Sequence, residues 1–195
     1  MVRPKIHDQA LRGRLLERAG QMLSRGGLAA ISLRTLARDC GTSTTAVYSL
    51  FGGKPGLLAA VLDEALRRFT ARLAGVVPGA DPVDDVVRLG AAYRSGALAD
   101  PHLFDAMFTG ELQPAEAKAA LDPLHELVDR AVAAHALRAD LDPATAALTL
   151  WSTVHGWVVL ERRGLLPEDL LDDRAARFED VLRSVLDGWR APEPA

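Results

Sequence analysis

The sequence predicts an all-α protein of about nine helices. Its 195 residues are rich in alanine, leucine and arginine and contain few runs of β-branched residues, and this composition favours helices over strands. Apolar residues recur at helical spacing, and proline or glycine stands between the periodic stretches. A chain of this length can also bury a sizeable core.

Start and stop signals place each helix in turn. A glycine pair at 26–27 ends the first helix, and the stretch VVPGADP at 76–82 indicates a break after the fourth. Prolines stand at or near the starts of the later helices, where the missing N–H has no intrahelical partner. We expect helices at 8–25, two short ones within 32–51, then 54–76, 83–99, 102–110, 114–137 with a bend near 122–123, 143–163 and 167–189.

Residues 32–51, SLRTLARDCGTSTTAVYSLF, predict two short helices joined by a tight turn. Gly41 is expected to end the first helix, because glycine enters the left-handed conformation without a steric cost. Ser43 can cap the second helix. The inner face is formed by Leu33, Leu36, Ala37, Val47, Leu50 and Phe51. The small polar residues left outside give the second helix the length and surface of one that enters a DNA major groove.

This segment resembles the N-terminal DNA-binding domain of the TetR family of transcriptional regulators, over roughly the first third of the chain. The motifs that carry the resemblance are Leu36-Ala37, Gly41-Thr42-Ser43, Tyr48-Ser49-Leu50-Phe51 and Lys54. Two positions depart from the family's pattern. Leu50 stands where histidine is common and removes one possible phosphate contact. Gly52-Gly53 stands where the family has proline or a longer polar side chain, and we expect it to loosen the junction.

The resemblance implies which residues contact DNA. Threonine and serine hydroxyls on the second helix are expected to face base edges, and Tyr48 is expected to give its hydroxyl to a phosphate. Lys54 stands at a helix N-terminus, where free N–H groups and the helix dipole favour an anion. The expected DNA-contacting residues are Ser32, Arg34, Thr42, Thr44, Thr45, Tyr48, Ser49 and Lys54.

Charge is distributed unevenly along the chain. Residues 1–55 contain nine Lys/Arg and three Asp/Glu, a net charge of +6, whereas the remainder carries −9 of the total of −3. A basic head on an acidic body is expected when a DNA-binding domain is fused to a body that does not bind DNA. We therefore place a helix-turn-helix domain at residues 1–53 and a helical ligand-binding and dimerisation domain at residues 54–195.

The C-terminal part carries a second resemblance. Residues 150–157, LWSTVHGW, and residues 101–108, PHLFDAMF, resemble the WHG-type C-terminal domain of a subset of TetR-like regulators. By analogy with that fold, a small hydrophobic molecule is expected between the central helices. Candidate lining residues are Tyr93, Phe104, Met107, Phe108, His125, Trp151 and His155. Each of them could instead be ordinary core, and Gly156 is expected to permit a close helix approach.

The last two helices are expected to pair with those of a second copy. Their apolar surface exceeds what one bundle face needs to hide, and two-fold pairing into a four-helix interface would match a palindromic operator. The expected interface residues are Val158, Phe178, Val181, Leu182, Val185, Leu186 and Trp189. Packing within the monomer is the competing interpretation.

No motif in the sequence indicates catalysis or a metal site. The five histidines form no HExxH or HxxxH pair, and Cys40 has no cysteine partner. Gly53-Lys54-Pro55 lacks the earlier glycine and the Ser/Thr of a phosphate loop, and no GxSxG surrounds Ser152. We expect a protein that is not an enzyme and has no cofactor. No apolar run approaches the ~20 residues of a membrane span, and we expect a cytoplasmic protein that does not contact the membrane.

These expectations combine into one hypothesis. The chain is expected to be a homodimeric regulator, a repressor, which binds a palindromic operator in double-stranded DNA and is released by a small hydrophobic effector. Two alternatives remain open. One is a DNA-binding regulator or architectural protein without a ligand, and the other is a helical enzyme with a helix-turn-helix head.

Overall fold

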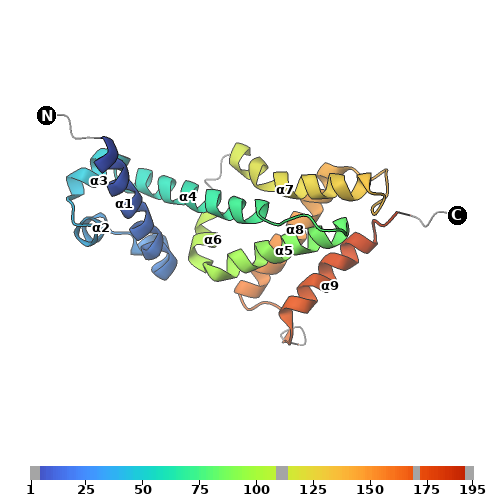
Figure 1. Cartoon of the computed structure of the whole chain (residues 1–195). Coiled ribbons are helices and arrows are strands. Elements are labelled where there is room, and N and C mark those ends of the chain that lie inside the picture. Colours follow the sequence, from blue (N-terminus) through green and yellow to red (C-terminus); the bar gives the residue numbers. More distant parts are fainter. Residues whose placement is uncertain (1–4, 109–113, 169–171, 192–195) are drawn as a thin grey trace. The chain divides into compact units, whose positions relative to one another are not determined.

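All nine expected helices are present in the computed structural model, which describes residues 5–108, 114–168 and 172–191 (Figure 1). The described residues contain no β-strand beyond an isolated bridge between Leu137 and Arg190, so the all-α prediction is confirmed. The elements are α1 (Lys5–Gly26), the 3₁₀ helix η1 (Leu28–Ala30), α2 (Leu33–Asp39), α3 (Thr44–Phe51), α4 (Lys54–Ala74), α5 (Pro82–Ala99), α6 (Pro101–Met107), α7 (Pro114–Ala133), α8 (Pro143–Arg162) and α9 (Arg174–Asp187).

The helices form two compact units, which are described separately. The N-terminal unit comprises Met1–Arg68 and Asp100–Leu112, and the C-terminal unit comprises Phe69–Ala99 and Gln113–Ala195. The N-terminal unit therefore extends past residue 53, where we expected its domain to end. It takes in the first part of α4 and the short helix α6.

One apolar core explains the extent of the N-terminal unit. Leu57 and Val61 of α4 and Ala106 of α6 are buried in the same cluster as the helix-turn-helix residues. Each of these helices turns one apolar face inward, so the cluster is built from short stretches of several helices. Its fully buried members are Leu15, Ala19, Leu23, Leu36, Val47 and Leu57.

In the C-terminal unit, α5 packs against α7, α8 and α9. Gly90 marks the close approach of α5 to α9, since a Cβ added there would lie 2.5 Å from Leu182 Cδ1. Val154 of α8 and Phe178 of α9 would lie 3.5 and 3.6 Å from the same Cβ. A small residue at the centre of α5 thus lets two neighbouring helices pack against its backbone.

Two helix boundaries differ from the prediction. Pro167 lies outside α9, which begins at Arg174 after an aspartate cap: the side chain of Asp173 accepts a hydrogen bond from Ala176 N at 3.3 Å. α7 ends at Ala133 instead of continuing to residue 137, and it runs as one helix through its internal proline. The chain after α7 instead pairs with the end of α9, where Arg138 N donates to the Trp189 carbonyl at 2.9 Å.

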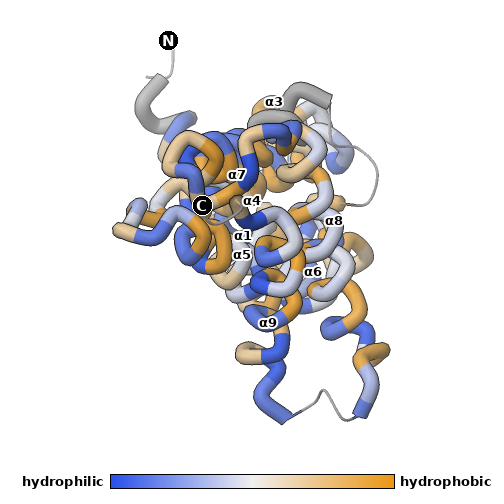
Figure 2. The backbone as a smooth tube through the Cα atoms, turned by 90° about the vertical axis from the view of Figure 1, so that its right-hand side faces the viewer, coloured by the Kyte–Doolittle hydropathy of each residue, from blue (hydrophilic) through white to orange (hydrophobic). Residues whose placement is uncertain are grey.

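Within the described part of the chain, no single helix has the length and apolar character needed to cross a membrane. α3 and α4 reach that length and apolar character only when they are taken together, and the pair is bent by 63°. Val47 and Leu57 from this pair are fully buried in the N-terminal core. Polar and apolar residues also alternate along the helices (Figure 2).

Candidate nucleic-acid interface and interior polar cluster

Local backbone interactions fix the turn between α2 and α3. Gly41 has φ +64°, the left-handed conformation expected for it. Ser43 Oγ accepts a hydrogen bond from Ala46 N at 3.2 Å and so caps α3. Ser32 Oγ accepts one from Thr35 N at 3.4 Å at the start of α2, so this expected DNA contact also serves as a helix cap. Thr42 is half-buried in the turn between the two caps.

α3 presents a polar face to solvent. Thr44, Thr45, Tyr48 and Ser49 are all exposed, Tyr48 to 57%, whereas Val47 is fully buried. Residues four apart lie on the same side of a helix, so the two threonines and the two residues one turn later form one stripe. Four of the expected DNA contacts therefore share one accessible surface.

The junction between α3 and α4 depends on three glycines. Gly52 and Gly53 have φ of +73° and +118°, a region that residues with side chains rarely adopt. A Cβ added at Gly53 would lie 3.1 Å from Tyr48 Cε1, and one added at Gly56 would overlap the carbonyl oxygen of Phe51. A side chain would be blocked at Gly56 and crowded at Gly53, whereas one at Gly52 would meet nothing within 4 Å. The expectation that Gly52-Gly53 loosens this junction stays a prediction.

The cations near α3 fall into two groups. Arg18 donates to Asp39 Oδ2 from Nε and NH2 at 2.9 and 2.6 Å, and Arg38 NH2 donates to Oδ1 at 3.1 Å. These hydrogen bonds hold the pKa of Asp39 below its usual value. Arg34 on α2 and Lys54 at the start of α4 form no ion pair with any residue that the structure describes. Arg34 and Lys54 are therefore free to meet a phosphate.

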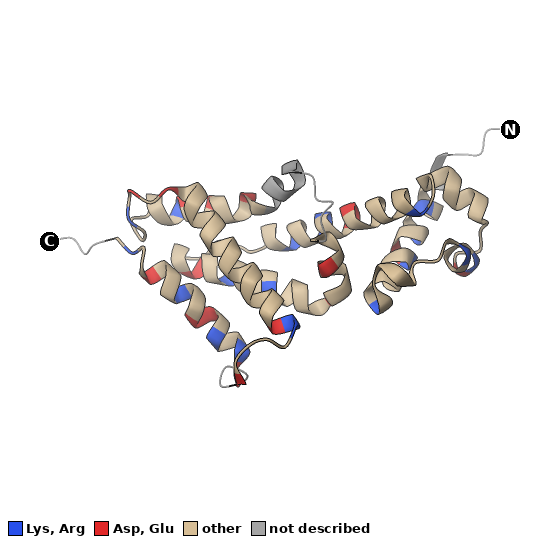
Figure 3. Cartoon of the chain, turned by 180° about the vertical axis from the view of Figure 1, so that it is seen from behind, with Lys and Arg blue, Asp and Glu red and all other residues tan. Residues whose placement is uncertain are grey.

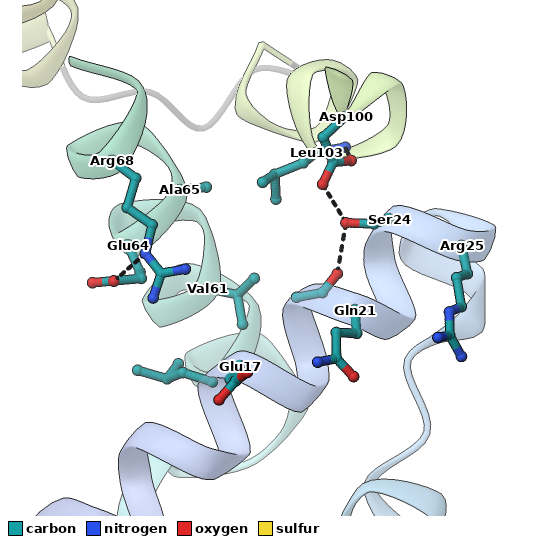
Figure 4. A pocket seen from close by; sticks show the side chains of 12 residues that line it. Glu17, Gln21, Ser24, Arg25, Val61, Glu64, Ala65, Arg68, Asp100 and Leu103 are labelled. Carbon is teal, nitrogen blue, oxygen red and sulfur yellow. Dashed lines mark hydrogen bonds and ion pairs between the residues drawn. The ribbon is translucent and has the colours of Figure 1, made fainter. Parts of the chain in front are cut away.

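A groove of about 400 Å³ lies within the N-terminal unit between α1, α4 and α6 (Figure 4). Ser24 of α1 hydrogen-bonds Asp100, whose other oxygen caps α6 by accepting from Leu103 N at 3.1 Å. Arg68 on the facing wall pairs with Glu64 at 2.6 Å. None of the residues expected to bind a ligand lines this groove.

A polar cluster lies in the C-terminal unit, where α5 packs on α8. Tyr93 Oη lies 2.8 Å from His155 Nδ1, and the rings of Trp151 and His155 are 5.6 Å apart. The Phe69 ring meets Tyr93 edge-on at 5.1 Å. Burial raises the pKa of Tyr93 and lowers that of His155, so both groups are uncharged at neutral pH. Tyr93, Trp151 and His155, three of the expected ligand residues, thus lie together.

The other expected ligand residues lie elsewhere. Phe104 and Met107 are buried and Phe108 is half-buried, all on or next to α6 in the N-terminal unit. The rings of the two phenylalanines are 4.7 Å apart. His125 is half-buried on α7. A Cβ added at Gly156 would have nothing within 4 Å, so the close approach expected there is absent from the described part of this chain.

A buried ion pair joins α5 and α8, and it was not predicted from the sequence. Arg94 contacts both oxygens of Glu161, at 2.7 Å from Nε and 2.5 Å from NH2. Trp157 Nε1 donates to the same carboxylate at 3.1 Å, and Arg94 also lies over the ring of Phe178. The paired residues are 67 positions apart, so the sequence holds no local signal of their contact.

A second buried carboxylate holds the start of α5. Asp85 is fully buried and accepts hydrogen bonds from Arg88, from Arg130 of α7 and, at 2.8 Å, from Gly79 N. The spacing of Asp85 and Arg88 is visible in the sequence as a helical i, i+3 pair. The contact of Asp85 with Arg130, which lies 45 residues away along the chain, has no such signal in the sequence.

Four of the seven residues expected at the dimer interface are buried inside the C-terminal unit. Val158, Phe178, Leu182 and Leu186 are each at most 1% exposed. The apolar stripe of α9 faces α5 of the same copy. This agrees with the alternative interpretation, in which these residues pack within the monomer. The half-buried members are Val181, Val185 and Trp189.

The outer faces of α8 and α9 present different residues. On α8, Leu148 and Leu160 are 53% and 43% exposed. Ser152 between them is also exposed, and Gly156 borders open space. α9 carries basic and acidic residues along its length (Figure 3). From the sequence, Leu148 and Leu160 already counted as apolar surface of this helix that a second copy would cover, although neither is among the seven interface residues named above.

Two stretches of the sequence match models of known protein domains. Residues 15–61 match the bacterial regulatory proteins of the tetR family, and residues 86–185 match the tetracyclin repressor-like C-terminal domain. The second match covers more than half of the chain and includes the Tyr93, Trp151 and His155 cluster.

Known proteins resemble the chain over most of its length. The HTH-type transcriptional repressor KstR of Rhodococcus jostii (strain RHA1) is 26% identical over 185 residues, which cover 93% of this chain and 86% of KstR. A solved structure of a protein of unknown function from Rhodococcus sp. RHA1 is 28% identical, with a TM-score of 0.81 over 92% of this chain and 95% of that one.

A more distant structure shares the fold alone. FadR from Bacillus subtilis in complex with stearoyl-CoA is 15% identical, with a TM-score of 0.68 over 90% of this chain and 97% of that one. The two family matches, one on the helix-turn-helix and one on the helical body, settle the classification. The chain belongs to the TetR family and is a DNA-binding transcriptional regulator.

Proposed function

We propose that two copies of this chain form a repressor that binds a palindromic operator and leaves it when a small hydrophobic molecule binds the C-terminal unit. The observation that carries the proposal is the exposed polar stripe of α3, held by caps and glycines on a rigid core. The repressor named KstR, which aligns with most of the chain, supports the direction of regulation. Such a protein would act in the cytoplasm, where the bacterial chromosome lies.

In this proposal α3 enters the major groove and flanking groups contact the backbone. Arg34 and Lys54 each lie in the first turn of a helix, where free N–H groups and the helix dipole also favour a phosphate. The exposed hydroxyl of Tyr48 suits a further phosphate. Ser32 and Thr42 remain candidates from the helix ends next to these cations.

The proposed dimer uses the outer face of α8 rather than the buried stripe of α9. Leu148 and Leu160 are large apolar side chains that lie in solvent in a single copy. Ser152 and Gly156 between them offer a low surface on which a second α8 could cross. Val181 and Val185 of α9, which are half-buried, could complete the contact.

The proposed effector binds near the Tyr93 and His155 pair. Both groups are uncharged, so they suit a molecule that is mostly apolar and has one polar group able to hydrogen-bond. FadR, which shares this fold, was solved with stearoyl-CoA, and a bundle of this type can therefore accept a ligand with an acyl chain. The effector must bind the released state more tightly than the DNA-bound state.

Selection of random duplexes with the purified chain, at a stated salt concentration, tests the central proposal. We expect an enriched palindrome whose half-sites lie about one helical turn, or a multiple of it, apart. An enriched site without two-fold symmetry would contradict the dimeric reading, and no enrichment at all would contradict sequence-specific binding.

Two cation variants test the assigned DNA surface. Arg34→Ala and Lys54→Ala should weaken binding to every duplex and reduce the slope of log K against log salt by about one each. Arg177→Ala, which removes an exposed arginine on α9, is the matched control and should leave the slope unchanged. If Lys54→Ala binds the operator like the parent, Lys54 does not belong to the interface.

Dimerisation and release have their own tests. Leu148→Asp with Leu160→Asp should yield monomers by sedimentation equilibrium, whereas Leu165→Asp, at another exposed leucine, should stay dimeric.

Stearoyl-CoA and stearate, added to the operator complex, probe release. A dimer that stays on its operator with every apolar compound tried would favour the alternative, a ligand-independent regulator.

A further inference from the structure

The solvent face of α3 contains no side-chain nitrogen. The residues from Gly41 to Gly53, GTSTTAVYSLFGG, include no Arg, Lys, His, Asn, Gln or Trp. Guanine is read in the major groove chiefly by Arg or Lys, and adenine by Asn or Gln, through pairs of hydrogen bonds. This helix therefore lacks the groups that usually distinguish purines.

The groups present instead are methyls and hydroxyls. Thr44 and Thr45 are exposed in the first turn of α3, the end that contacts base edges when a recognition helix lies in the groove. Among the described residues, no hydrogen bond engages the hydroxyl of either threonine, whereas Thr149 and Thr153 of α8 donate to carbonyls four residues earlier. The methyl group and the hydroxyl group of Thr44 and of Thr45 are thus available to a ligand.

We infer that this regulator recognises its operator chiefly through the C5-methyl groups of thymines, packed against the methyl groups of Thr44 and Thr45. This inference rests on the proposed function, since it assumes that α3 enters the major groove. A thymine methyl is the one apolar group in that groove, and threonine is among the side chains that pack on it. Arg34 and Lys54 then supply affinity through phosphates without reading sequence.

The inference makes a prediction about the operator itself. Each half-site should contain at least one A·T pair beneath α3, and replacing its thymidine by deoxyuridine removes only the methyl group. Loss of one buried methyl should weaken binding about fourfold. Deoxyuridine outside the half-sites should have no effect and serves as the control.

Matched variants separate the protein methyl from the hydroxyl. Thr45→Ser and Thr44→Ser keep the hydroxyl and remove the methyl, whereas Thr45→Val and Thr44→Val keep a methyl and remove the hydroxyl. At least one serine variant should bind the thymidine and deoxyuridine operators equally, and the corresponding valine variant should keep the fourfold difference. Both positions are exposed, and Thr, Ser and Val have similar helix propensities, so the fold should be retained.

Anisotropy titrations of these variants against both operators, at one salt concentration, give a double-mutant cycle between two methyl groups. Equal binding of the parent to both operators would overturn the inference. A fourfold difference that persists in both serine variants would also overturn it, because the methyl would then act through DNA shape. Half-sites made only of G·C pairs would do the same. If no duplex is enriched in the selection, the proposed function itself fails, and that result is distinct from these three.

Discussion

The two units of this protein place their polar side chains in opposite ways. In the N-terminal unit the described core is apolar, and the polar groups that matter lie on the solvent face of short helices. The C-terminal unit instead buries Asp85, Glu161 and Tyr93. Each of them has one partner at least 45 residues away along the chain, and these distant partners are Arg130, Arg94 and His155.

This difference indicates how each unit should respond to substitution. A surface side chain of α3 can change without disturbing the core beneath it, so changes there should affect DNA binding more than stability. A buried polar side chain in the C-terminal unit leaves its partner unsatisfied when it is removed, so changes there should affect stability first. The tryptophans at 151, 157 and 189 all belong to the C-terminal unit, and their fluorescence reports on that unit.

The largest effect is expected from Glu161→Ala. Arg94, whose side chain is only 16% exposed, would keep its charge without a partner, and the indole N–H of Trp157 would lose its acceptor. Removing one member of a buried ion pair costs roughly 3–5 kcal/mol in the free energy of unfolding. Urea unfolding followed by tryptophan fluorescence measures this loss.

The double variant Arg94→Met with Glu161→Leu is the control for the ion pair. It removes both charges and replaces them with apolar side chains of similar size, so most of the lost stability should return. A double variant as unstable as Glu161→Ala would show that shape, rather than an unpaired charge, causes the loss.

A smaller effect, confined to the N-terminal unit, is expected from Gly56→Ala. The added Cβ would overlap the carbonyl oxygen of Phe51, and a backbone atom cannot rotate away as a side chain can. Overpacking of this kind costs roughly 1–3 kcal/mol, and it should displace α4 from the end of α3 and weaken operator binding. Circular dichroism melting and anisotropy measure the two effects.

Gly13→Ala is the matched control on a neighbouring helix. A Cβ at Gly13 meets nothing within 4 Å, so this variant should be more stable by about 1 kcal/mol, because alanine has the higher helix propensity. If Gly56→Ala binds the operator as tightly as Gly13→Ala does, the position of α4 does not control the recognition helix.

The N-terminal unit could be predicted from sequence because its determinants are local. The predicted cap at Ser43 and the predicted left-handed Gly41 each act within a few residues, and the structure contains both. The cap at Ser32 is equally local, but Ser32 was expected only as a DNA contact. The crowding at Gly53 was not predicted, because it depends on a contact in three dimensions. Only the structure shows that Gly53 lies against the Tyr48 ring.

The C-terminal unit resisted prediction because its polar contacts join distant helices. Tyr93 and His155 were chosen as ligand residues from the sequence, but their hydrogen bond to each other was not foreseen. Leu182 and Leu186 were assigned to a dimer because an apolar stripe does not reveal which neighbour it meets. Helical spacing identifies a buried face, whereas the packing partner depends on the whole arrangement of helices.

Tyr93→Phe should have an effect of intermediate size on the C-terminal unit. The change removes the hydroxyl that lies 2.8 Å from His155 Nδ1 and keeps the ring that packs on Phe69. A lost buried hydrogen bond costs about 1 kcal/mol, which urea unfolding can measure. If the effector binds this pair, the variant should also need more ligand for release from DNA. An unchanged release curve would place the ligand elsewhere.

The smallest effect is expected at the surface of the N-terminal unit, from Asp39→Asn. Hydrogen bonds from Arg18 and Arg38 lower the pKa of Asp39 in the folded state, so the folded state favours the ionised carboxylate. The ionised carboxylate of Asp39 therefore stabilises the folded state at pH values above the ordinary carboxyl pKa. This stabilisation is lost as pH falls through the lowered pKa. Melting temperatures from pH 6 down to pH 3 should fall less steeply in Asp39→Asn than in the parent.

Asp63→Asn, an exposed carboxylate of α4 that forms no ion pair with the described residues, should follow the parent curve. If Asp39→Asn followed it as well, the arginine contacts at the end of α2 would contribute nothing to acid stability, and the surface charges of this unit would matter for DNA alone.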